Sequence, residues 1–416
     1  MSVTDRRMGQ PDRTAAVPTE PGATRVVRRP KNRRAQIAIE AAAAFSSKGY
    51  HGVSMHDIAG RLGISATALY RHYRSKYALF REELFRLAQL TVDAATLAAD
   101  AVDQAPRERY ERIISTAVDE TIANRPTVAL ARWERRFLTG EDRRELDDLF
   151  AVAVRRLGNE LAQERPELRR DDIAVRSVTA FSVINSIGDH RSSLPAKRLA
   201  RLLQSACRAL LEIDLPAPVH PQHTEPVLPV PAPFMHELLL TRAVDLFYEN
   251  GYKNVTMGEI AASVDLASAS AVYHYYGSKS NLLTAAFRRA ADRSAAVIGP
   301  TVAGAASPEQ ALSQLIQMYV EESFDARALT YVYYAEFRNV APADRVALKR
   351  IQKLVVSEWT ELLVLVRPEL SKAEARILVH AGFALVVDLG QALGDNGVAP
   401  RNRVIALHRA TLFGHA

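Results

Sequence analysis

The chain has 416 residues, of which 48% are hydrophobic and 24% charged. This composition is typical of a folded soluble protein and excludes a mainly disordered or collagen-like chain, and the length predicts two or three domains. The single cysteine, Cys207, cannot form an internal disulfide, and we expect it to be a small core residue. Without a signal-peptide pattern or an uncharged apolar run of roughly 18 residues, we expect a cytoplasmic protein with no membrane partner.

The net charge of +7 lies entirely in the first half of the chain. Residues 1–216 hold 36 basic and 28 acidic residues, whereas residues 217–416 hold 18 and 19. The excess of positive charge in the first half favours a polyanionic partner, of which nucleic acid is the first candidate. A basic, solvent-exposed surface without such a partner explains the charge equally well.

The chain begins with a segment that lacks hydrophobic periodicity, residues 1–30, which we predict to be a disordered basic arm. Such an arm would add non-specific attraction to DNA or enter a minor groove. The basic residues of the arm and of the helical pattern that follows it are Arg25, Arg28, Arg29, Lys31, Arg33 and Arg34.

Residues 31–84 divide into three short helices. The helices predicted from apolar spacings of three and four span residues 34–47, 55–62 and 66–73. Ser54 and Ser65 are suited to cap the second and third helices, and Gly63 is suited to the tight turn between them. Two short helices joined by a glycine-containing turn are typical of a helix-turn-helix, whose second helix enters the major groove of DNA.

A longer helical pattern covers residues 85–214 and stops at residues 215–234, where seven prolines fall within 18 residues. Proline fixes φ and lacks a backbone donor, so this segment is predicted to be an extended linker. His220 and His223 lie in it without nearby thiols or carboxylate pairs, and we expect no metal site there.

After the linker the sequence repeats itself at an offset of 202 residues. Gly49-Tyr50 corresponds to Gly251-Tyr252, and Arg165-Pro-Glu-Leu168 corresponds to Arg367-Pro-Glu-Leu370. A period near 200 residues indicates a duplicated domain, and the absence of alternating strand patterns predicts that both copies are all-α. The second copy would comprise residues 235–284 and 285–416.

One long ordered pattern opens the first copy: Gly49-Tyr50-x-Gly-Val53-Ser-Met-x-x-Ile58-Ala59-x-x-Leu-Gly63-Ile-Ser65-x-x-x-Leu69-Tyr70-x-His72-Tyr73-x-Ser-Lys76-x-x-Leu79. It resembles the DNA-binding region of the tetracycline-repressor (TetR) family. The resemblance implies a dimer of all-α units, each an N-terminal helix-turn-helix region followed by a larger helical ligand and dimerisation domain. A small molecule in that domain would change the spacing of the two helix-turn-helix regions, which we call reading heads.

By matched position the resemblance also implies DNA contacts. Thr67, Tyr70 and Arg71 would lie near bases, and Thr67 offers a hydroxyl and a methyl group to base edges. Tyr73 is instead expected to pack in the core of the small domain. The predicted DNA-binding residues of the first copy are Ser54, Ala66, Thr67, Tyr70, Arg71, His72, Arg74 and Lys76, with phosphate contacts expected for Ser54, His72, Arg74 and Lys76.

The second copy departs from this pattern. Asp265 replaces the turn glycine, one residue is inserted in the turn, and two arginines of the first copy become His274 and Gly277. Asp265 has a side chain that can cap a helix, but near a phosphate it would repel. Loss of specific DNA binding by this copy is therefore favoured over its retention. If binding is retained, the residues concerned would be Thr256, Ser268, Tyr273, His274 and Lys279.

Aromatic residues gather in the larger helical regions and suit either an apolar ligand or ordinary core packing. The candidate pocket residues are Trp133, Tyr331, Tyr334 and Trp359. Arginines 132, 135, 136, 143 and 144 suit an anionic ligand or a solvated helical face, and we favour the solvated face.

The last two helices of each copy are predicted near residues 172–188, 196–213, 372–391 and 401–413. In the family the matching helices form a four-helix dimer bundle. Two copies in one chain allow an intramolecular pseudo-dimer, which we favour slightly over a homodimer of whole chains.

Taken together, these patterns predict a DNA-binding transcriptional regulator, a ligand-responsive repressor whose partners are a double-stranded operator and a small, partly apolar effector. The alternative is a protein-interaction or effector-sensing module on the same scaffold with DNA binding reduced or lost. No P-loop, HExxH or Gly-x-Ser-x-Gly pattern occurs, so we predict no catalytic residue, no cofactor and no bound metal.

Overall fold

The computed structural model of the chain describes residues 33–98, 101, 103–192, 194–217, 234–393 and 398–414. Within these ranges every element of regular secondary structure is a helix, so the all-α prediction is confirmed. Four residues of the predicted basic arm and the two linker histidines lie outside the described residues, namely Arg25, Arg28, Arg29, Lys31, His220 and His223.

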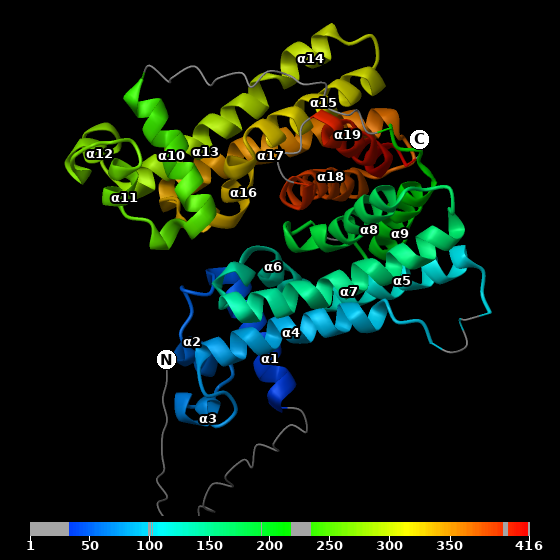
Figure 1. Cartoon of the computed structure of the whole chain (residues 1–416), viewed down its shortest axis with the longest axis horizontal. Helices are drawn as coiled ribbons and strands as arrows, with labels where there is room; N and C mark the ends of the chain where they lie inside the picture. The colour runs from blue at the N-terminus through cyan, green and yellow to red at the C-terminus, as the bar shows by residue number, and fades with distance from the viewer. Residues whose placement is uncertain are drawn as a thin grey trace, which may run out of the picture.

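The two copies have the same order of helices (Figure 1). The first copy contains α1 (Arg33–Lys48), α2 (Met55–Arg61), α3 (Ala66–Tyr70), α4 (Lys76–Ala94), α5 (Pro106–Ala123), α6 (Arg125–Trp133), η2 (Arg135–Phe137), α7 (Gly140–Glu164), α8 (Arg170–Asn185), η3 (Ser186–Gly188) and α9 (Ala196–Glu212). Helix α3 ends three residues earlier than the sequence predicts.

The second copy contains α10 (Met235–Asn250), η4 (Tyr252–Asn254), α11 (Met257–Ala262), α12 (Ala269–Tyr276), α13 (Lys279–Ala296), α14 (Ile298–Gly304), α15 (Pro308–Asp325), α16 (Arg327–Glu336), η5 (Phe337–Asn339), α17 (Pro342–Val366), α18 (Lys372–Leu393) and α19 (Val398–Phe413). Helices α10 to α13 repeat α1 to α4, and α15 to α19 repeat α5 to α9. Among the described residues α14 has no counterpart in the first copy.

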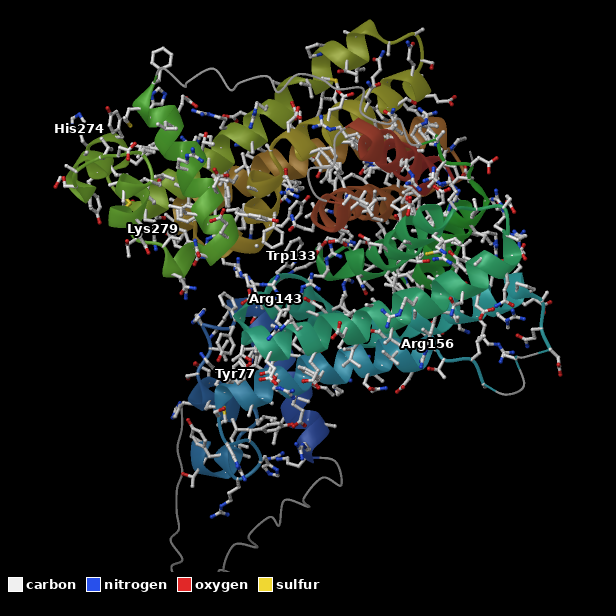
Figure 2. All side chains as sticks on the ribbon, viewed as in Figure 1. Tyr77, Trp133, Arg143, Arg156, His274 and Lys279 are labelled. Atoms are coloured by element: carbon white, nitrogen blue, oxygen red, sulfur yellow. The ribbon has the colours of Figure 1, made fainter. Side chains whose placement is uncertain are left out.

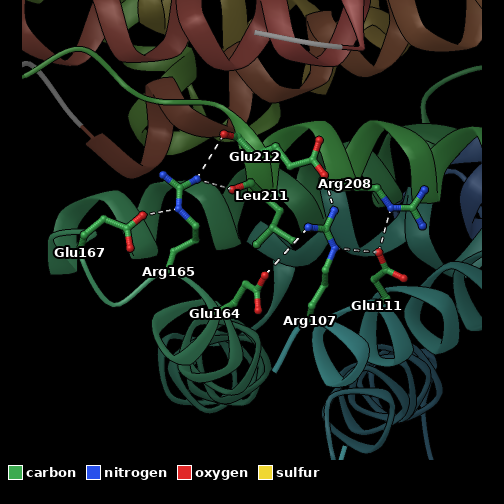
Figure 3. Close-up of polar contacts among 8 residues, drawn as sticks. All are labelled: Arg107, Glu111, Glu164, Arg165, Glu167, Arg208, Leu211 and Glu212. Carbon is green, nitrogen blue, oxygen red and sulfur yellow. Dashed lines mark hydrogen bonds and ion pairs between the residues drawn. The ribbon is translucent and has the colours of Figure 1, made fainter. Parts of the chain in front are cut away.

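The repeated Arg-Pro-Glu-Leu motif fastens α7 to the end of α9 (Figure 3). The Arg165 guanidinium donates to the carbonyl oxygens of Leu211 at 3.1 Å and Glu212 at 3.2 Å. In the second copy, Arg367 donates to the carbonyl oxygen of Leu412 at 3.1 Å. The last carbonyls of a helix lack partners within the helix and carry partial negative charge, so a guanidinium there satisfies and stabilises them.

The two copies pack on each other through a four-helix bundle of α8, α9, α18 and α19 (Figure 1). Helix α8 lies against α18, and α9 lies against α19. One continuous apolar core runs through both copies and includes the fully buried Val183, Leu203, Leu385 and Leu407. Because burial of apolar surface contributes roughly 25 cal/mol per Å², this shared core is the main attraction between the copies.

Ion pairs flank the apolar core of the bundle. Arg198 of α9 binds Glu374 of α18 at 2.6 Å, and Arg403 of α19 pairs with Asp172 of α8. Arg132 of α6 lies 3.0 Å from Asp189 of its own copy and 2.7 Å from Asp388 of the other.

The preference for a solvated face is therefore wrong for Arg132, whose side chain is 8% exposed. The face of α6 that carries Arg132 packs against the second copy, and the sequence of the first copy alone does not indicate this contact.

Helix α18 is long and apolar enough to cross a membrane by length and composition, but 67% of its apolar window is buried inside the protein, as in a core helix. Its Gly382 allows close packing, because a Cβ there would lie 2.2 Å from Nε2 of His408 on α19. His408 is fully buried and stacks on Trp359 with ring centroids 5.9 Å apart.

Buried neutral histidines predict an acid-sensitive fold. Burial lowers the pKa of His408 to about 3, and burial with nearby Arg376 and Arg125 lowers the pKa of His380 to about 4. In the unfolded chain both titrate near their ordinary value, about 6.5, so the unfolded state binds more protons below that pH. We therefore expect stability to be constant above about pH 7 and to fall as the pH drops from 6.5 towards 4.

Thermal unfolding between pH 4 and 8 measures this loss, which reaches about 3 kcal/mol at pH 4 for a histidine shifted like His408. His408→Phe should make the fall shallower, whereas the control His56→Gln, at an exposed position on α2, should leave it unchanged. Identical pH profiles for wild type and His408→Phe would contradict this account.

Candidate nucleic-acid interface and effector cavities

The first reading head consists of α1, α2 and α3, joined by two turns that need glycine. Gly49 (φ +75°) ends α1, and Gly63 (φ +62°) forms the turn between α2 and α3. Ser54 and Ser65 cap α2 and α3 by accepting backbone N–H bonds from Asp57 and Ala68, as predicted. These local signals hold the second helix of the motif in a single orientation.

The predicted base-contacting side chains stand on the outer face of α3 and the turn after it. Tyr70 is 51% exposed, and Thr67, Arg71, His72 and Arg74 are also exposed. Ala66 is half-buried. Leu69 on the opposite face is fully buried, and Tyr73 is 4% exposed, which confirms that Tyr73 belongs to the core of the domain.

Two residues predicted to hold phosphates have structural partners inside the domain. The Ser54 hydroxyl and backbone N–H both donate to the Asp57 carboxylate, at 2.6 and 2.8 Å, which lowers the pKa of Asp57. The Lys76 ammonium donates to the Tyr50 carbonyl oxygen at 3.0 Å and lies 4.4 Å from the centre of the Tyr50 ring. Their phosphate contacts stay predictions, whereas Arg74 is exposed and has no such partner among the described residues.

The second reading head keeps the scaffold. Its Lys279 donates to the carbonyl oxygens of Tyr252 and Val255, at 2.8 and 2.6 Å, and Thr256 forms a capping box with Glu259. Asp265 occupies the turn position of Gly63, with φ +57°.

Of the two possibilities for Asp265, the structure does not show the helix cap, since Ser263 is the C-cap of α11 and Ser268 the N-cap of α12. Asp265 takes the left-handed conformation that short polar side chains tolerate. The N-cap residue of α12 is Ser268, which makes no side-chain capping bond.

The surfaces of the two heads differ in charge. Residues 33–84 contain eight basic and four acidic residues, a net of +4, whereas the equally long 235–286 contain three and five, a net of −2. On α12 the exposed side chains include Tyr273, 49% exposed, and His274, which lies at the outer tip of the second head (Figure 2). Because phosphate attraction supplies most non-specific DNA affinity, only the first head has a suitable electrostatic surface.

A pair of buried glutamates, one per copy, ties each head to the opposite copy. Glu134 accepts the backbone N–H of Tyr50 at 2.9 Å and an Nη1 bond of Arg338, from the second copy, at 2.8 Å. Reciprocally, Glu336 accepts the N–H of Tyr252 at 2.8 Å and an Nη1 bond of Arg136 at 2.7 Å. The preference for a solvated Arg136 is thus wrong, since its side chain is 12% exposed.

The two links are not identical. Arg338 also donates to the Ser46 carbonyl oxygen at the end of α1, at 2.7 Å, whereas the second Arg136 bond goes to Ala335, outside the second head. Gly49 makes the first link possible, because a Cβ there would lie 3.1 Å from Nη1 of Arg338. The second copy therefore touches the first head directly.

Three of the four candidate pocket residues meet at the junction of the copies. Trp133, whose place is marked in Figure 2, stacks on Tyr334 with ring centroids 5.4 Å apart. Its ring also lies 6.0 Å from that of Tyr331. Trp359 is not with them. It is 3% exposed, packs against Tyr319, and lines none of the cavities described below.

Cavities lie inside each copy. In the second copy, a cavity of about 110 Å³ lies among α13, α15, α16 and α17 and is lined by Tyr319, Tyr333 and Tyr334. In the first copy, a cavity of about 320 Å³ is lined by Trp133 and Phe181, and the second copy adds Tyr331, Asp388 and Gln391 to its wall.

Comparisons with known proteins agree with this geometry. The sequence profile of the bacterial regulatory proteins of the tetR family matches residues 39–82 and again residues 239–286. Both helix-turn-helix regions belong to the TetR family, and the chain carries two tandem TetR-type repeats. Each match covers the helix-turn-helix of one copy, so both heads have the TetR-type helix-turn-helix fold.

Individual relatives share single segments with this chain. The HTH-type transcriptional activator FasR of Mycolicibacterium smegmatis is 43% identical over 54 residues, which are 13% of this chain and 25% of FasR. The chain thus spans about a quarter of the length of this curated relative.

Two solved structures are similar to part of the chain. A TetR-family regulator from Bordetella parapertussis has 20% identity and a TM-score of 0.40 over 42% of this chain and 93% of its own. The ketosteroid regulator KstR2 of Mycobacterium tuberculosis has 22% identity and a TM-score of 0.37 over 45% and 97%.

Because α3 of the first head exposes the predicted base-contacting side chains, we expect substitutions there to lower DNA affinity, and the equivalent substitutions in the second head to leave it nearly unchanged. Tyr70→Ala with Arg71→Ala should weaken binding to operator DNA by about tenfold or more, because base contacts are worth about 1–3 kcal/mol each. Arg74→Ala should instead weaken all DNA binding and lower the salt-dependence slope by about one.

The matched control is Tyr273→Ala with His274→Ala at the corresponding place in the second head, which we expect to change affinity less than twofold. Fluorescence anisotropy with operator and random duplexes at several salt concentrations measures both effects. Unchanged operator binding by the Tyr70 and Arg71 double variant would refute the assignment.

The buried Glu134 predicts a stability effect. Arg338→Met leaves this carboxylate without its cationic partner and should destabilise the protein by about 2–4 kcal/mol in urea unfolding. Arg135→Met, which removes the more exposed ion pair with Asp147, should cost less than about 1 kcal/mol. Equal effects of the two substitutions would contradict a special role for the Glu134 link.

Proposed function

We propose that this TetR-family regulator is a ligand-responsive cytoplasmic repressor that reads double-stranded operator DNA with its first head. The observation that supports this most is the exposure of Thr67, Tyr70 and Arg71 on a head of net charge +4. The corresponding face of the second head has no arginine, and that head has a net charge of −2. A repressor of this kind occupies the operator and blocks transcription until an effector binds.

The same proposal assigns the functional unit to a single chain. Helices α8, α9, α18 and α19 already bury one another within the chain, so their apolar faces are covered without a second molecule. One effective reading head then faces one half of the operator, and the recognised sequence need not be palindromic.

An apolar effector suits the cavity in the second copy. Its lining combines Tyr319, Tyr333 and Phe383 with short side chains such as Ala290 and Thr330. Helices α13 and α17 form two of its walls. Helix α16 also lines the cavity, and just beyond it Arg338 binds Ser46 of the first head, so a ligand that shifts α16 moves a contact of the head that reads DNA.

The test of this function combines mass and footprint. Light scattering on the purified chain should give the mass of one chain, 45.9 kDa, and hydroxyl-radical footprinting should show a protected region without two-fold symmetry. A mass of twice that value with a palindromic footprint would favour a homodimer in which two first heads read the two half-sites.

A reporter assay tests the direction of regulation. Deleting the regulator should raise expression from its operator, whereas a decrease would assign activation, the role named for FasR. If no genomic DNA is retained in a salt-sensitive binding assay, the chain is instead an interaction module on a TetR scaffold.

A further inference from the structure

A third cavity lies between the two copies and belongs to neither helical interior. Its volume is about 560 Å³, within the range of about 300–1,000 Å³ that is usual for small-molecule sites. Residues from α1 and α6 of the first copy and from α16, α17 and α18 of the second line it. It exists only because the copies pack together, so a single TetR unit would not contain it.

One side of this cavity is aromatic. Trp133 of the first copy and Tyr333, Tyr334, Phe337 and Phe383 of the second contribute their rings to the lining. Stacked and tilted rings hold this wall in place, since Tyr333 lies 5.6 Å from Phe337 and 5.8 Å from Tyr334 between ring centroids. Such a wall suits a planar or otherwise apolar ligand body.

The remaining lining is strongly cationic. Its charged residues are Arg125, Arg191, Arg338, Arg345 and Lys349, with Asp189 as the single carboxylate. One oxygen of that carboxylate, Oδ1, accepts bonds from Arg132 at 3.0 Å and from the Trp133 indole at 2.7 Å. Its other oxygen, Oδ2, is buried without a hydrogen-bond partner among the described residues, and the Arg132 guanidinium balances its charge. Among the described residues, Arg345 and Lys349 have no acidic partner within 4 Å, so their charge is available to a ligand.

Two buried donors in the lining have no acceptor. Nε of Arg345 is buried without a hydrogen-bond partner in the described part of the chain, and so is Nε2 of His190. The neutral His190 ring accepts the Ser192 backbone N–H at Nδ1, at 3.1 Å, which places its own proton on Nε2. These two groups are donors, and an oxygen anion placed beside them would satisfy them, whereas the buried Asp189 Oδ2 is an acceptor and would not bind it.

The equivalent positions of the first copy are neutralised. Arg143 corresponds to Arg345, and Asp147 corresponds to Lys349 at the 202-residue offset. Asp147 lies 3.9 Å from Arg143 and 3.1 Å from Arg135. The free positive charge at the cavity is thus a feature of the second copy alone, and the shared scaffold does not require it.

We propose that this junction cavity is an effector site for an organic anion that carries a carboxylate or phosphate on an apolar, ring-sized body. The rings hold the body, and Arg345, Lys349 and His190 bind the anionic end. The wall also contains Ser46, at the end of α1, and Arg338, which binds the Ser46 carbonyl oxygen. An anion that draws Arg338 towards itself loosens the contact between the second copy and the first head.

Isothermal titration of the full chain without DNA tests the site. The probes are naphthalene-2-carboxylate and its uncharged analogue naphthalene-2-carboxamide, and we expect the carboxylate to bind at least tenfold more tightly. Lys349→Asp, which installs the residue of the first copy at an exposed position, should lower carboxylate affinity at least tenfold. Arg143→Ala is the matched control and should leave it within twofold.

Three results would overturn the site: equal affinity for the two probes, no carboxylate binding at millimolar concentration, or equal effects of Lys349→Asp and Arg143→Ala. Circular dichroism and urea unfolding establish that the variants are folded. The effect of the bound anion on DNA affinity rests on the proposed function. Because the titrations contain no DNA, failure of the site and failure of operator binding remain distinguishable.

Discussion

The arrangement of the two reading heads depends on a buried carboxylate in each copy. Glu134 and Glu336 each hold a backbone N–H just beyond the first helix of a head and each accept an arginine from the opposite copy. A charge taken out of water is stable only while its partners stay in place, so neither head can turn freely while the copies remain packed. The apolar core of the bundle supplies the attraction between the copies, and the two glutamate–arginine links fix how each head is oriented.

The reading heads were predictable because their signals are local. Ser54 and Ser65 lie at the helix starts, Gly63 lies in the turn, and the helices appear within a few residues of their predicted bounds. The exposure of Tyr70 and the burial of Tyr73 also follow from helical spacing. Charge loss in the second head and the place of Asp265 in the turn were equally visible, whereas the left-handed backbone that Asp265 adopts there was not predicted.

The features missed by sequence reasoning arise where the copies meet. Arg132 and Arg136 resemble surface arginines in a single helix, and only the neighbouring copy turns them into buried partners. The junction cavity has the same origin, since the lining residues of the first copy lie more than 100 positions from those of the second. The repeated Arg-Pro-Glu-Leu motif was recognised, but its contact with the end of a distant helix depends on α5 and α8, which pack on both α7 and α9 and bring their ends together.

The bundle of α8, α9, α18 and α19 forms between segments of one polypeptide, and this changes how the protein responds to dilution. Two separate subunits dissociate when their concentration falls below the dissociation constant of the dimer. The occupancy of DNA by the dimer then rises with the square of the subunit concentration. Segments joined by a linker keep a fixed effective concentration, so their pairing is unaffected by the number of molecules present. Occupancy of a DNA target by a regulator that works as a single chain would therefore rise in simple proportion to its concentration.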